Sequence, residues 1–539
     1  MSATDPAPLA YAYPLLVKQL LHAPLATAAD QEIVYRDRCR HTYRAFRERI
    51  GRLASALAAS GVAPGQTVAM MDWDSHRYLE AFFAIPMMGA VLQTVNVRLS
   101  PEQILYTLNH AGADVLVVNA EFLPLLASFR DRLETVRTCV LISDDPIACP
   151  PDFAGEYEAL LATADPAYSF PDFDENTRAT AFYPTGTTGL PKGVHFSHRQ
   201  LELHTLAAAV GYTAAPTAGR LHREDVYMPL TPMFHVHAWG LPYVATLLGV
   251  KQVYPGRYVP EELLGLIAAE GVTFSHCVPT ILHMLLTCPA GEGGDLSGWK
   301  VVIGGAAFPR GLAAAALARG IDVFAGYGMS ETGPLLTLAR VPSAAGPEEQ
   351  LAARVRTGQP VPLVELRTVD DELRDVPRDG QTPGEVVVRA PWLTPGYLAD
   401  PVASATLWEG GYLHTGDVGT LAPDGTLQIT DRAKDVIKTG GEWVSSLAVE
   451  SIISEHPAVS EVAVIGVRDD RWGERPMALV VLKAGHDASA EAIRGTVMAA
   501  AEAGRVSRYA VPERVRFVTA LARTSVGKLN KKAMREEVA

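Results

Sequence analysis

Cysteine is scarce in this chain of 539 residues, and its five cysteines lie far apart. They are odd in number, and no two of them form a C-x-x-C pair. This spacing indicates neither a zinc ribbon nor a framework of disulfides. We expect reduced, mostly buried thiols in a cytoplasmic protein, at Cys39, Cys139, Cys149, Cys277 and Cys288.

Long hydrophobic runs and an excess of positive charge are also missing. The longest apolar runs, Ala81–Leu92 and Trp239–Val250, each contain a proline and are too short to span a bilayer. Asp5 precedes the first cation, Lys18, an order that argues against a signal peptide. The net charge of −13 argues against duplex nucleic acid or an anionic membrane surface as the main partner. We therefore expect no nucleic-acid partner and no stable membrane insertion.

What the sequence does contain is an ordinary globular composition, with 48% hydrophobic and 20% charged residues. From Thr42 to Gly61 apolar side chains recur at helical spacing, which predicts a helix. Short apolar segments alternate with such helices, as expected of an α/β fold in which helices cover parallel sheets. The predicted buried helix is Ala81–Met88, and the predicted strands are Val68–Met71, Ala113–Val118, Val301–Ile303 and Val323–Ala325.

The pattern changes toward the C-terminus. After about residue 380, turns separate short predicted strands at Gly384–Arg389, Gly419–Leu421 and Thr426–Thr430. A new α/β pattern follows Asp431, with helices predicted at 447–455 and 490–503 and strands at 462–467 and 477–483. We therefore predict an N-terminal domain of residues 1–431, with a β-rich subdomain at about 340–430, and a C-terminal domain of residues 432–539.

The most informative motif is the run Tyr183-Pro184-Thr185-Gly186-Thr187-Thr188-Gly189-Leu190-Pro191-Lys192-Gly193. Its glycines let the backbone approach an anion, its hydroxyl and N–H groups can surround phosphate oxygens, and Lys192 supplies a cation. The spacing differs from the GxxxxGK[ST] of a P-loop, so a P-loop NTPase is not indicated. The run predicts a different kind of phosphate site.

Two further runs follow strand-like segments. The run Gly326-Tyr327-Gly328-Met329-Ser330-Glu331-Thr332-Gly333 offers a flat ring, a hydroxyl and a carboxylate that can hold Mg²⁺ near phosphate oxygens. The small residues of Val302-Ile303-Gly304-Gly305-Ala306-Ala307 leave room for a planar purine. Taken alone, either run is more simply a turn between a strand and a helix.

Three further runs complete the set. Thr415-Gly416-Asp417 places a short carboxylate at a turn, where it can accept hydrogen bonds from ribose hydroxyls. The charged run 431–443 would by itself be a solvated connector, and Lys528, in the run 523–528, would be plain surface.

Together, the six runs in this order resemble the adenylate-forming superfamily of acyl-CoA synthetases, luciferases and peptide-synthetase adenylation domains. The resemblance spans nearly the whole chain. The run Pro232-Met233-Phe234-His235-Val236-His237-Ala238-Trp239 and the segment 440–446 are similar to the fatty-acyl-CoA synthetase branch. The fold implied is a large N-terminal domain of α/β sheets with a β-rich subdomain, followed by a small, mobile α+β C-terminal domain. The activity implied is ATP-dependent ligation of an acid to coenzyme A, in the cytoplasm.

The resemblance also implies which residues bind ATP and Mg²⁺. The phosphates would lie against Thr185, Gly186, Thr187, Thr188, Gly189 and Lys192. Adenine would stack on Tyr327, beside Gly305, Ala306 and Gly328. Asp417 would bind the ribose, and Arg432 the ribose or a phosphate. Glu331 would hold Mg²⁺, with Thr187 or Thr332 contributing oxygens.

In the same way, the resemblance assigns the catalytic lysines. Lys528 would bridge the substrate carboxylate and the α-phosphate, where two anions meet and a fixed cation stabilises the transition state. Lys434 would be the hinge about which the C-terminal domain rotates. That rotation would bring Gly440, Gly441, Glu442 and Trp443 to the acyl-adenylate for attack by the CoA thiol, with Lys438 serving the same half-reaction.

For the acid, the resemblance implies a pocket around His235. His235 would orient the carboxylate, and Trp239 is either a gate of the acyl tunnel or a core aromatic. The other predicted lining residues are Val236, Gly304, Gly328, Met329 and Ser330. His235 and His237 have the i, i+2 spacing of a strand but no nearby acidic or cysteine ligands, so we expect no metal there. A mostly apolar monocarboxylic acid is favoured, and a homodimer is a possible assembly by analogy with relatives.

One departure keeps alternatives open. Pro184 stands where many relatives have Ser or Thr, and it removes a hydroxyl and a backbone donor from the phosphate loop. A first alternative is therefore an enzyme whose adenylation step is weakened and which only transfers the acyl group of a supplied acyl-adenylate to CoA. A stand-alone enzyme that loads a carrier protein is a second alternative, and a non-catalytic nucleotide sensor a third.

Overall fold

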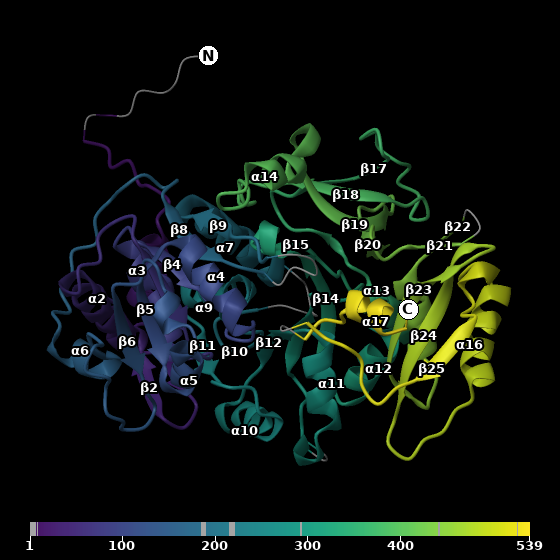
Figure 1. The fold of residues 1–539 in the computed structure, drawn as a ribbon, viewed down its shortest axis with the longest axis horizontal. Helices are drawn as coiled ribbons and strands as arrows, with labels where there is room; N and C mark the ends of the chain where they lie inside the picture. Colours follow the sequence, from purple (N-terminus) through teal and green to yellow (C-terminus); the bar gives the residue numbers. More distant parts are fainter. Residues whose placement is uncertain are drawn as a thin grey trace.

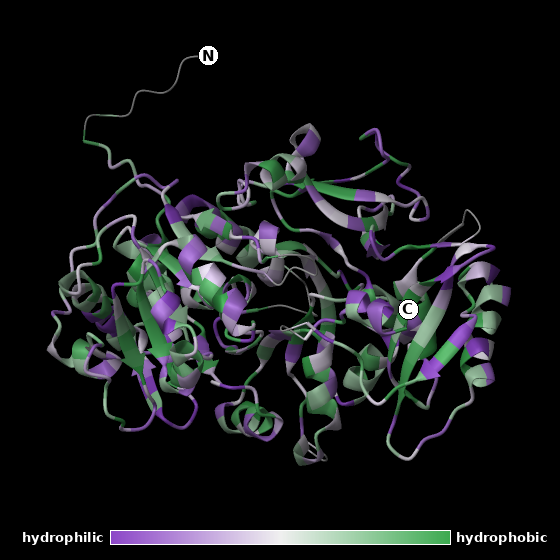
Figure 2. Cartoon of the chain, viewed as in Figure 1, coloured by the Kyte–Doolittle hydropathy of each residue, from purple (hydrophilic) through white to green (hydrophobic). Residues whose placement is uncertain are grey.

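The computed structural model describes residues 7, 9–184, 190–214, 221–291, 294–439, 442–524 and 527–538. Its described strands form four sheets, of seven, nine, four and five strands. In Figure 1 the chain runs from two large sheets, coloured purple to teal, through a green β-rich part to a yellow C-terminal part. Apolar residues concentrate on the strands of the large sheets and on the helix faces that cover them (Figure 2).

The seven-stranded sheet has the order β7-β6-β5-β3-β4-β8-β9, and only the pair β8–β9 is antiparallel. All five residues of β3 are buried, as expected of a parallel strand that is covered on both faces. Its strands are β3 (Thr67–Met71), β4 (Val91–Thr94), β5 (Ala113–Asn119), β6 (Thr138–Ile142), β7 (Gly155–Glu156), β8 (Arg178–Phe182) and β9 (Val194–Ser197).

The predicted helices of this part are confirmed. Helix α2 (Tyr43–Ala59) is capped by Thr42, whose side chain accepts a hydrogen bond from the N–H of Ala45. Helix α3 (His76–Met87) is buried at all twelve positions and begins five residues before the predicted start. The neighbouring helices are α1 (His22–Thr27), α4 (Pro101–Ala111), α5 (Leu123–Ala127), α6 (Tyr157–Thr163) and α7 (His198–Thr213).

The nine-stranded sheet has the order β16-β15-β14-β13-β12-β10-β11-β1-β2. Its strands β12, β13 and β14 run parallel, so the loops after β13 and β14 emerge at the same edge, where open α/β sheets bind ligands. The strands are β1 (Glu32–Tyr35), β2 (Cys39–Thr42), β10 (Val226–Leu230), β11 (Lys251–Tyr254), β12 (Phe274–Cys277), β13 (Lys300–Ile303), β14 (Asp322–Gly328), β15 (Leu335–Leu338) and β16 (Gln359–Pro360). The helices are α8 (Val236–Trp239), α9 (Leu241–Leu248), α10 (Pro260–Glu270), α11 (Pro279–Thr287), α12 (Arg310–Ala318) and α13 (Pro347–Val355).

The β-rich segment forms a four-stranded antiparallel sheet, with helix α14 (Pro401–Leu407) before its third strand. The strands are β17 (Glu365–Val369), β18 (Gly384–Arg389), β19 (Leu413–Leu421) and β20 (Leu427–Arg432). Strand β18 has the predicted bounds, whereas the short segment predicted at Gly419–Leu421 is the end of the nine-residue β19.

The last sheet begins at β21 (Ile437–Thr439), and four residues separate it from the end of β20. Its other strands are β22 (Glu442–Val444), β23 (Val459–Asp469), β24 (Gly473–Leu482) and β25 (Arg514–Phe517), with helices α15 (Ser446–Ser454), α16 (Ala490–Glu502) and α17 (Lys531–Val538). This sheet packs on the N-terminal part through α15 and α12: a Cβ added to Gly311 would lie 2.7 Å from the carbonyl oxygen of Ser454. No helix among the described residues is long and apolar enough to cross a membrane.

Candidate active site

Glycines at the ends of β13 and β14 bring two loops close together. A Cβ on Gly328 would lie 1.7 Å from the carbonyl oxygen of Pro334, and one on Gly304 would lie 2.8 Å from that of Gly326. Side chains cannot enter these spaces, so the backbones approach each other directly. The predicted runs around Gly304 and Tyr327 are thus neighbours in space.

Tyr327 connects the large sheet to the β-rich sheet. Its hydroxyl donates a hydrogen bond to Oδ2 of Asp417 at 2.8 Å, and Oδ1 of Asp417 accepts from Nε of Arg432 at 3.1 Å. Burial and the Asp417 charge raise the pKa of Tyr327 well above its usual value. The Asp417 charge likewise raises the pKa of Arg432. The three residues predicted to hold adenine and ribose therefore form one connected group.

Lys528 reaches this group from the C-terminal part of the chain. Its Cε would lie 3.1 Å from a Cβ on Gly305, and the carbonyl oxygen of the preceding Gly527 accepts a hydrogen bond from Oγ1 of Thr280 at 3.4 Å. Burial and the charge of Arg432 lower the pKa of Lys528 to about 8, although Asp417 and Glu331 act in the opposite direction. The ammonium thus lies among the predicted nucleotide-binding residues.

His235 is buried within range of the Lys528 charge. Burial and the positive charges of Lys528 and Arg98 lower the pKa of His235 to about 3, so its imidazole is neutral near pH 7. A neutral ring can donate or accept one hydrogen bond without adding charge. This suits a group that orients a carboxylate beside a lysine.

Glu331 is held by a tyrosine that the sequence analysis missed. The hydroxyl of Tyr397 donates to Oε1 of Glu331 at 2.8 Å, and Nζ of Lys192 lies 4.6 Å from the centre of the Tyr397 ring. The carbonyl oxygen of Glu331 accepts from the N–H of Thr394 at 2.9 Å. The carboxylate and Lys192, predicted to serve Mg²⁺ and the phosphates, are thereby brought together.

Thr332 has a structural part in this loop. It is fully buried, and its hydroxyl accepts from the N–H of Met329 at 3.0 Å and donates to the carbonyl oxygen of Pro334. Met329 and Ser330 on the same turn are partly exposed, as is Gly305, and Ala306 is exposed. The observed contacts of Thr332 are therefore with its own loop.

The prediction that His235 and His237 lie on a strand is wrong. Val236 to Trp239 form one left-handed turn, with φ between 47° and 58°. The turn directs His237 into a cluster of aromatic rings, 5.2 Å from Phe182 and 5.6 Å from Phe82 between centroids. Trp239 instead lies on the site side, 3.0 Å from a Cβ built on Gly304, and the buried Val236 packs in the core.

Lys434 lies in the turn between β20 and β21, where the charges of Arg432 and Asp417 act on it, and Lys438 is exposed on β21. The backbones of Glu442 and Trp443 form part of β22, which pairs with β21. The remaining predicted residues lie outside the described part of the chain: Thr185, Gly186, Thr187, Thr188, Gly189, Gly440 and Gly441.

The residues that sequence reasoning missed are Tyr397, Arg98 and Thr280. Tyr397 follows a Pro-Gly pair in a turn, and nothing local distinguishes it from the other tyrosines among the 18 in the chain. Arg98 and Thr280 come from elements far away in sequence, and only the fold places them near Lys528 and His235.

Comparison with known proteins settles the family. Residues 21–398 match the family described as AMP-binding enzyme, and residues 448–528 match its C-terminal domain. The chain belongs to the AMP-binding enzymes. The predicted membership of the adenylate-forming superfamily and the α/β fold of the large domain are confirmed.

Relatives and solved structures agree with this assignment. A long-chain-fatty-acid–CoA ligase of Thermus thermophilus is 41% identical, covering 92% of this chain and 90% of that protein. A 3-methylmercaptopropionyl-CoA ligase of Ruegeria lacuscaerulensis is 40% identical, covering 90% and 89%. Among solved structures, an anthranilate CoA ligase in complex with anthranoyl-AMP superposes with a TM-score of 0.86 at 26% identity, over 97% of this chain and 98% of that one. The predicted class, an AMP-forming acid–thiol ligase, is confirmed by the relatives.

Proposed function

We propose that the protein activates a mostly apolar monocarboxylic acid with ATP and transfers the acyl group to coenzyme A. In the first step a carboxylate oxygen attacks the α-phosphorus of ATP, forming acyl-AMP and releasing pyrophosphate. In the second step the CoA thiol attacks the acyl carbon, forming the thioester and releasing AMP and a proton.

The observation that carries the proposal is the place of Lys528, whose side chain lies against Gly305 and whose charge acts on the buried His235. The attack brings a carboxylate against an anionic phosphate, and a fixed ammonium offsets their repulsion as charge develops. His235, neutral at this position, can donate a hydrogen bond that orients the carboxylate. The protein in this arrangement is suited to the first step.

The nucleotide would lie across the contact between the large sheet and the β-rich sheet. Adenine would stack on Tyr327, and the ribose hydroxyls would donate to Asp417, which Tyr327 and Arg432 already hold in place. Glu331 fits Mg²⁺, because Tyr397 holds Oε1 and leaves the carboxylate oriented beside Lys192. Bound there, Mg²⁺ would neutralise phosphate charge.

The second step would need another arrangement of the C-terminal domain. Lys438 is exposed on β21, and Gly440 and Gly441, which are proposed to approach the CoA thiol, follow β21 directly in sequence. We propose that the domain of residues 432–539 turns about Lys434, which removes Lys528 and brings β21 and β22 to the acyl-adenylate. A homodimer through the N-terminal domain is also proposed, by analogy with relatives.

Pyrophosphate release from ATP and Mg²⁺, with and without CoA, tests the function. The acids should include short, medium and long fatty acids, aryl acids and 3-methylmercaptopropionate, since two of the relatives are named for long-chain fatty acids and 3-methylmercaptopropionate. Release that depends on one class of acid, with CoA needed for turnover, supports the proposal.

The same assay separates the alternatives. An enzyme restricted to thioesterification by Pro184 would release no pyrophosphate but would convert synthetic acyl-adenylates and CoA to thioester. A carrier-loading enzyme would release pyrophosphate but would turn over with a phosphopantetheinylated carrier protein and not with CoA. Tight ATP binding with neither reaction would indicate a nucleotide sensor.

A further inference from the structure

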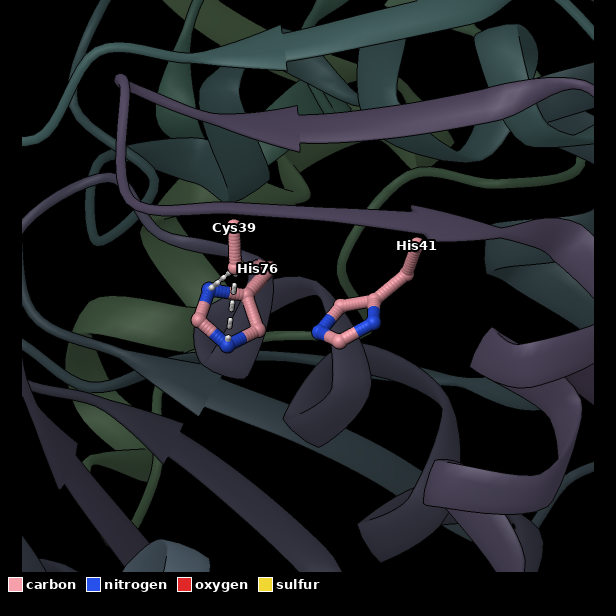
Figure 3. A group of neighbouring side chains, drawn as sticks. All are labelled: Cys39, His41 and His76. Carbon is pink, nitrogen blue, oxygen red and sulfur yellow. Dashed lines mark hydrogen bonds between the residues drawn. The ribbon is translucent and has the colours of Figure 1, made fainter.

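Three side chains with metal-binding atoms meet at the edge of the nine-stranded sheet, away from the loops after β13 and β14. Cys39 and His41 lie on β2, the edge strand, and their i, i+2 spacing places both on the same face. His76, the first residue of α3, lies opposite them (Figure 3). Six other strands separate β2 from β15 and β16 at the far edge of the sheet.

The donor atoms are close enough to share one ion. Sγ of Cys39 lies 3.6 Å from Nδ1 and 3.8 Å from Nε2 of His76, and the rings of His41 and His76 are 5.3 Å apart between centroids. One donor atom from each of the three residues lies within 4.8 Å of the other two. Donors around tetrahedral zinc, at bond lengths of about 2.0–2.3 Å, are roughly 3.5 Å apart, so only small side-chain rotations are required.

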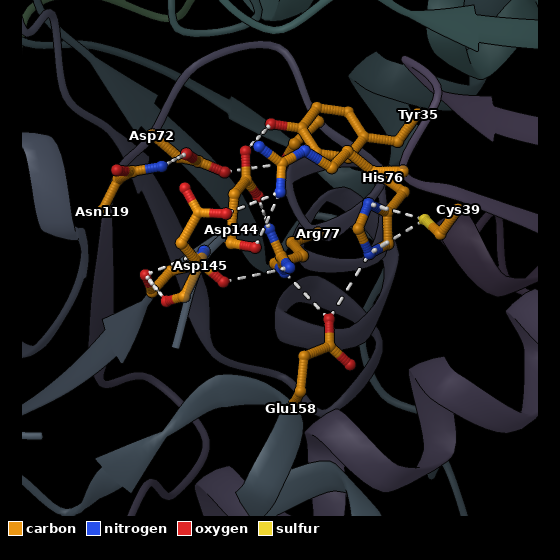
Figure 4. Close-up of polar contacts among 12 residues, drawn as sticks. Tyr35, Cys39, Asp72, His76, Arg77, Asn119, Asp144, Asp145 and Glu158 are labelled. Carbon is orange, nitrogen blue, oxygen red and sulfur yellow. Dashed lines mark hydrogen bonds and ion pairs between the residues drawn. The ribbon is translucent and has the colours of Figure 1, made fainter. Parts of the chain in front are cut away.

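The residues behind His76 provide the outer contacts that such sites usually have. Nε2 of His76 lies 3.4 Å from Oε1 of Glu158, which orients the ring and leaves Nδ1 for an ion (Figure 4). Glu158 is fixed by ion pairs of 2.8 Å each with Arg49 and Arg77. His76 is 3% exposed, while Cys39 and His41 are partly exposed, so an ion can enter from their side.

We propose that Cys39, His41 and His76 form a binding site for Zn²⁺ or a similar divalent transition metal. One thiolate and two imidazoles are a donor set that zinc prefers, with water as the fourth ligand. On binding, the thiol proton passes to solvent. Because β2 belongs to the nine-stranded sheet and α3 packs on the seven-stranded sheet, the ion would join the two large sheets. Its role is structural and independent of ATP chemistry.

Co²⁺ is the probe, because its spectrum reports thiolate ligation and tetrahedral geometry. The full-length protein, reduced and freed of metal, is titrated with Co²⁺ and then with Zn²⁺. We expect one Co²⁺ per chain with a thiolate-to-metal charge-transfer band and strong d–d bands, both lost on addition of Zn²⁺. C39S should lose the charge-transfer band. H41N should weaken binding by more than the roughly 10- to 100-fold typical of changes outside the ligand set.

C149S is the matched control, since Cys149 is also a partly buried thiol. It should keep the wild-type spectrum and affinity. Zn²⁺ should also raise the temperature of the first unfolding transition of the wild type and of C149S, because an ion that binds only the folded state stabilises it. The same temperature for C39S should not change. Circular dichroism would verify that C39S is folded.

A competing interpretation is that Cys39, His76 and Glu158 form a nucleophilic thiol with its base and orienting carboxylate. In that case a thiol reagent would modify Cys39 rapidly, and Zn²⁺ would not protect it. That result, or metal bound equally by C39S, would overturn the metal site. Neither readout requires adenylation activity, so the outcome is separate from that of the proposed function.

Discussion

The hydroxyl of Tyr327 donates a hydrogen bond to Asp417 at 2.8 Å and thereby ties the large sheet to the β-rich sheet at the proposed nucleotide site. Asp417 is almost fully buried and forms an ion pair with Arg432. Both contacts fix the carboxylate before a ribose arrives. Because the carboxylate is already oriented, less conformational entropy is lost when the nucleotide binds.

Removing that hydroxyl should weaken ATP binding. In Tyr327→Phe the ring remains for stacking, but Asp417 loses a hydrogen bond that contributes about 1.5–3 kcal/mol when one partner is charged. We expect KM for ATP to rise roughly tenfold or more, with a smaller change in kcat, in steady-state pyrophosphate release. Tyr412→Phe, which removes a similar contact with the exposed Glu365, is the control. Equal KM values in both variants would contradict the role of Tyr327.

The lysine assignment predicts unequal effects on the two half-reactions. Lys528→Ala removes the ammonium from the first step, and loss of one such group typically lowers a rate by about 10²–10³-fold. Thioester formation from a supplied acyl-adenylate and CoA should change much less. Lys532→Ala, on an exposed lysine that pairs with Glu536, should leave both steps unchanged. Comparable losses in both steps of Lys528→Ala would count against the assignment.

Regular elements could be predicted from the sequence because local patterns determine them. The bounds of β18 follow from three successive valines and the turn residues that flank them, and the start of α2 follows from a threonine at the N-cap. The turn at Val236–Trp239 could not be predicted, because non-glycine residues with positive φ are unfavourable locally and depend on tertiary contacts. Those contacts come from afar: the ring of His237 packs against the rings of Phe82 and Phe182.

The site shows the same division. Motif order could indicate Lys528, Glu331 and Asp417, because each lies in a recognisable run. The same reasoning missed Tyr397 and placed His237 on a strand, because both depend on elements that the chain brings together only on folding. The Cys39 cluster was missed for the same reason, since His76 lies 37 residues away.

The pH dependence of adenylation should report Lys528. Burial and Arg432 lower its pKa to about 8 in the unliganded protein, and only the ammonium form can offset the charge of the two anions. The kcat/KM for ATP should therefore fall as pH rises through about 8, while His235, with a pKa of about 3, stays neutral throughout. Lys528→Arg should be slower but should lose this decline, because arginine stays charged. A wild-type profile that falls only near the ordinary pKa of lysine would refute the prediction.

The contact between α12 and α15 predicts how the arrangement seen here can be disfavoured. A Cβ at Gly311 would lie 2.7 Å from the backbone oxygen of Ser454, so Gly311→Ala should push the C-terminal domain away and withdraw Lys528 from Gly305. We expect acyl-adenylate formation to fall at least several-fold, with thioester formation from a supplied acyl-adenylate less affected. Gly265→Ala is the matched control, because Gly265 is also in a helix and no atom lies within 4 Å of its added Cβ. Alanine favours both helices by about 1 kcal/mol, so a loss confined to Gly311→Ala reports the domain contact rather than helix stability. If both variants keep wild-type rates in both steps, the docking of α15 on α12 does not govern adenylation.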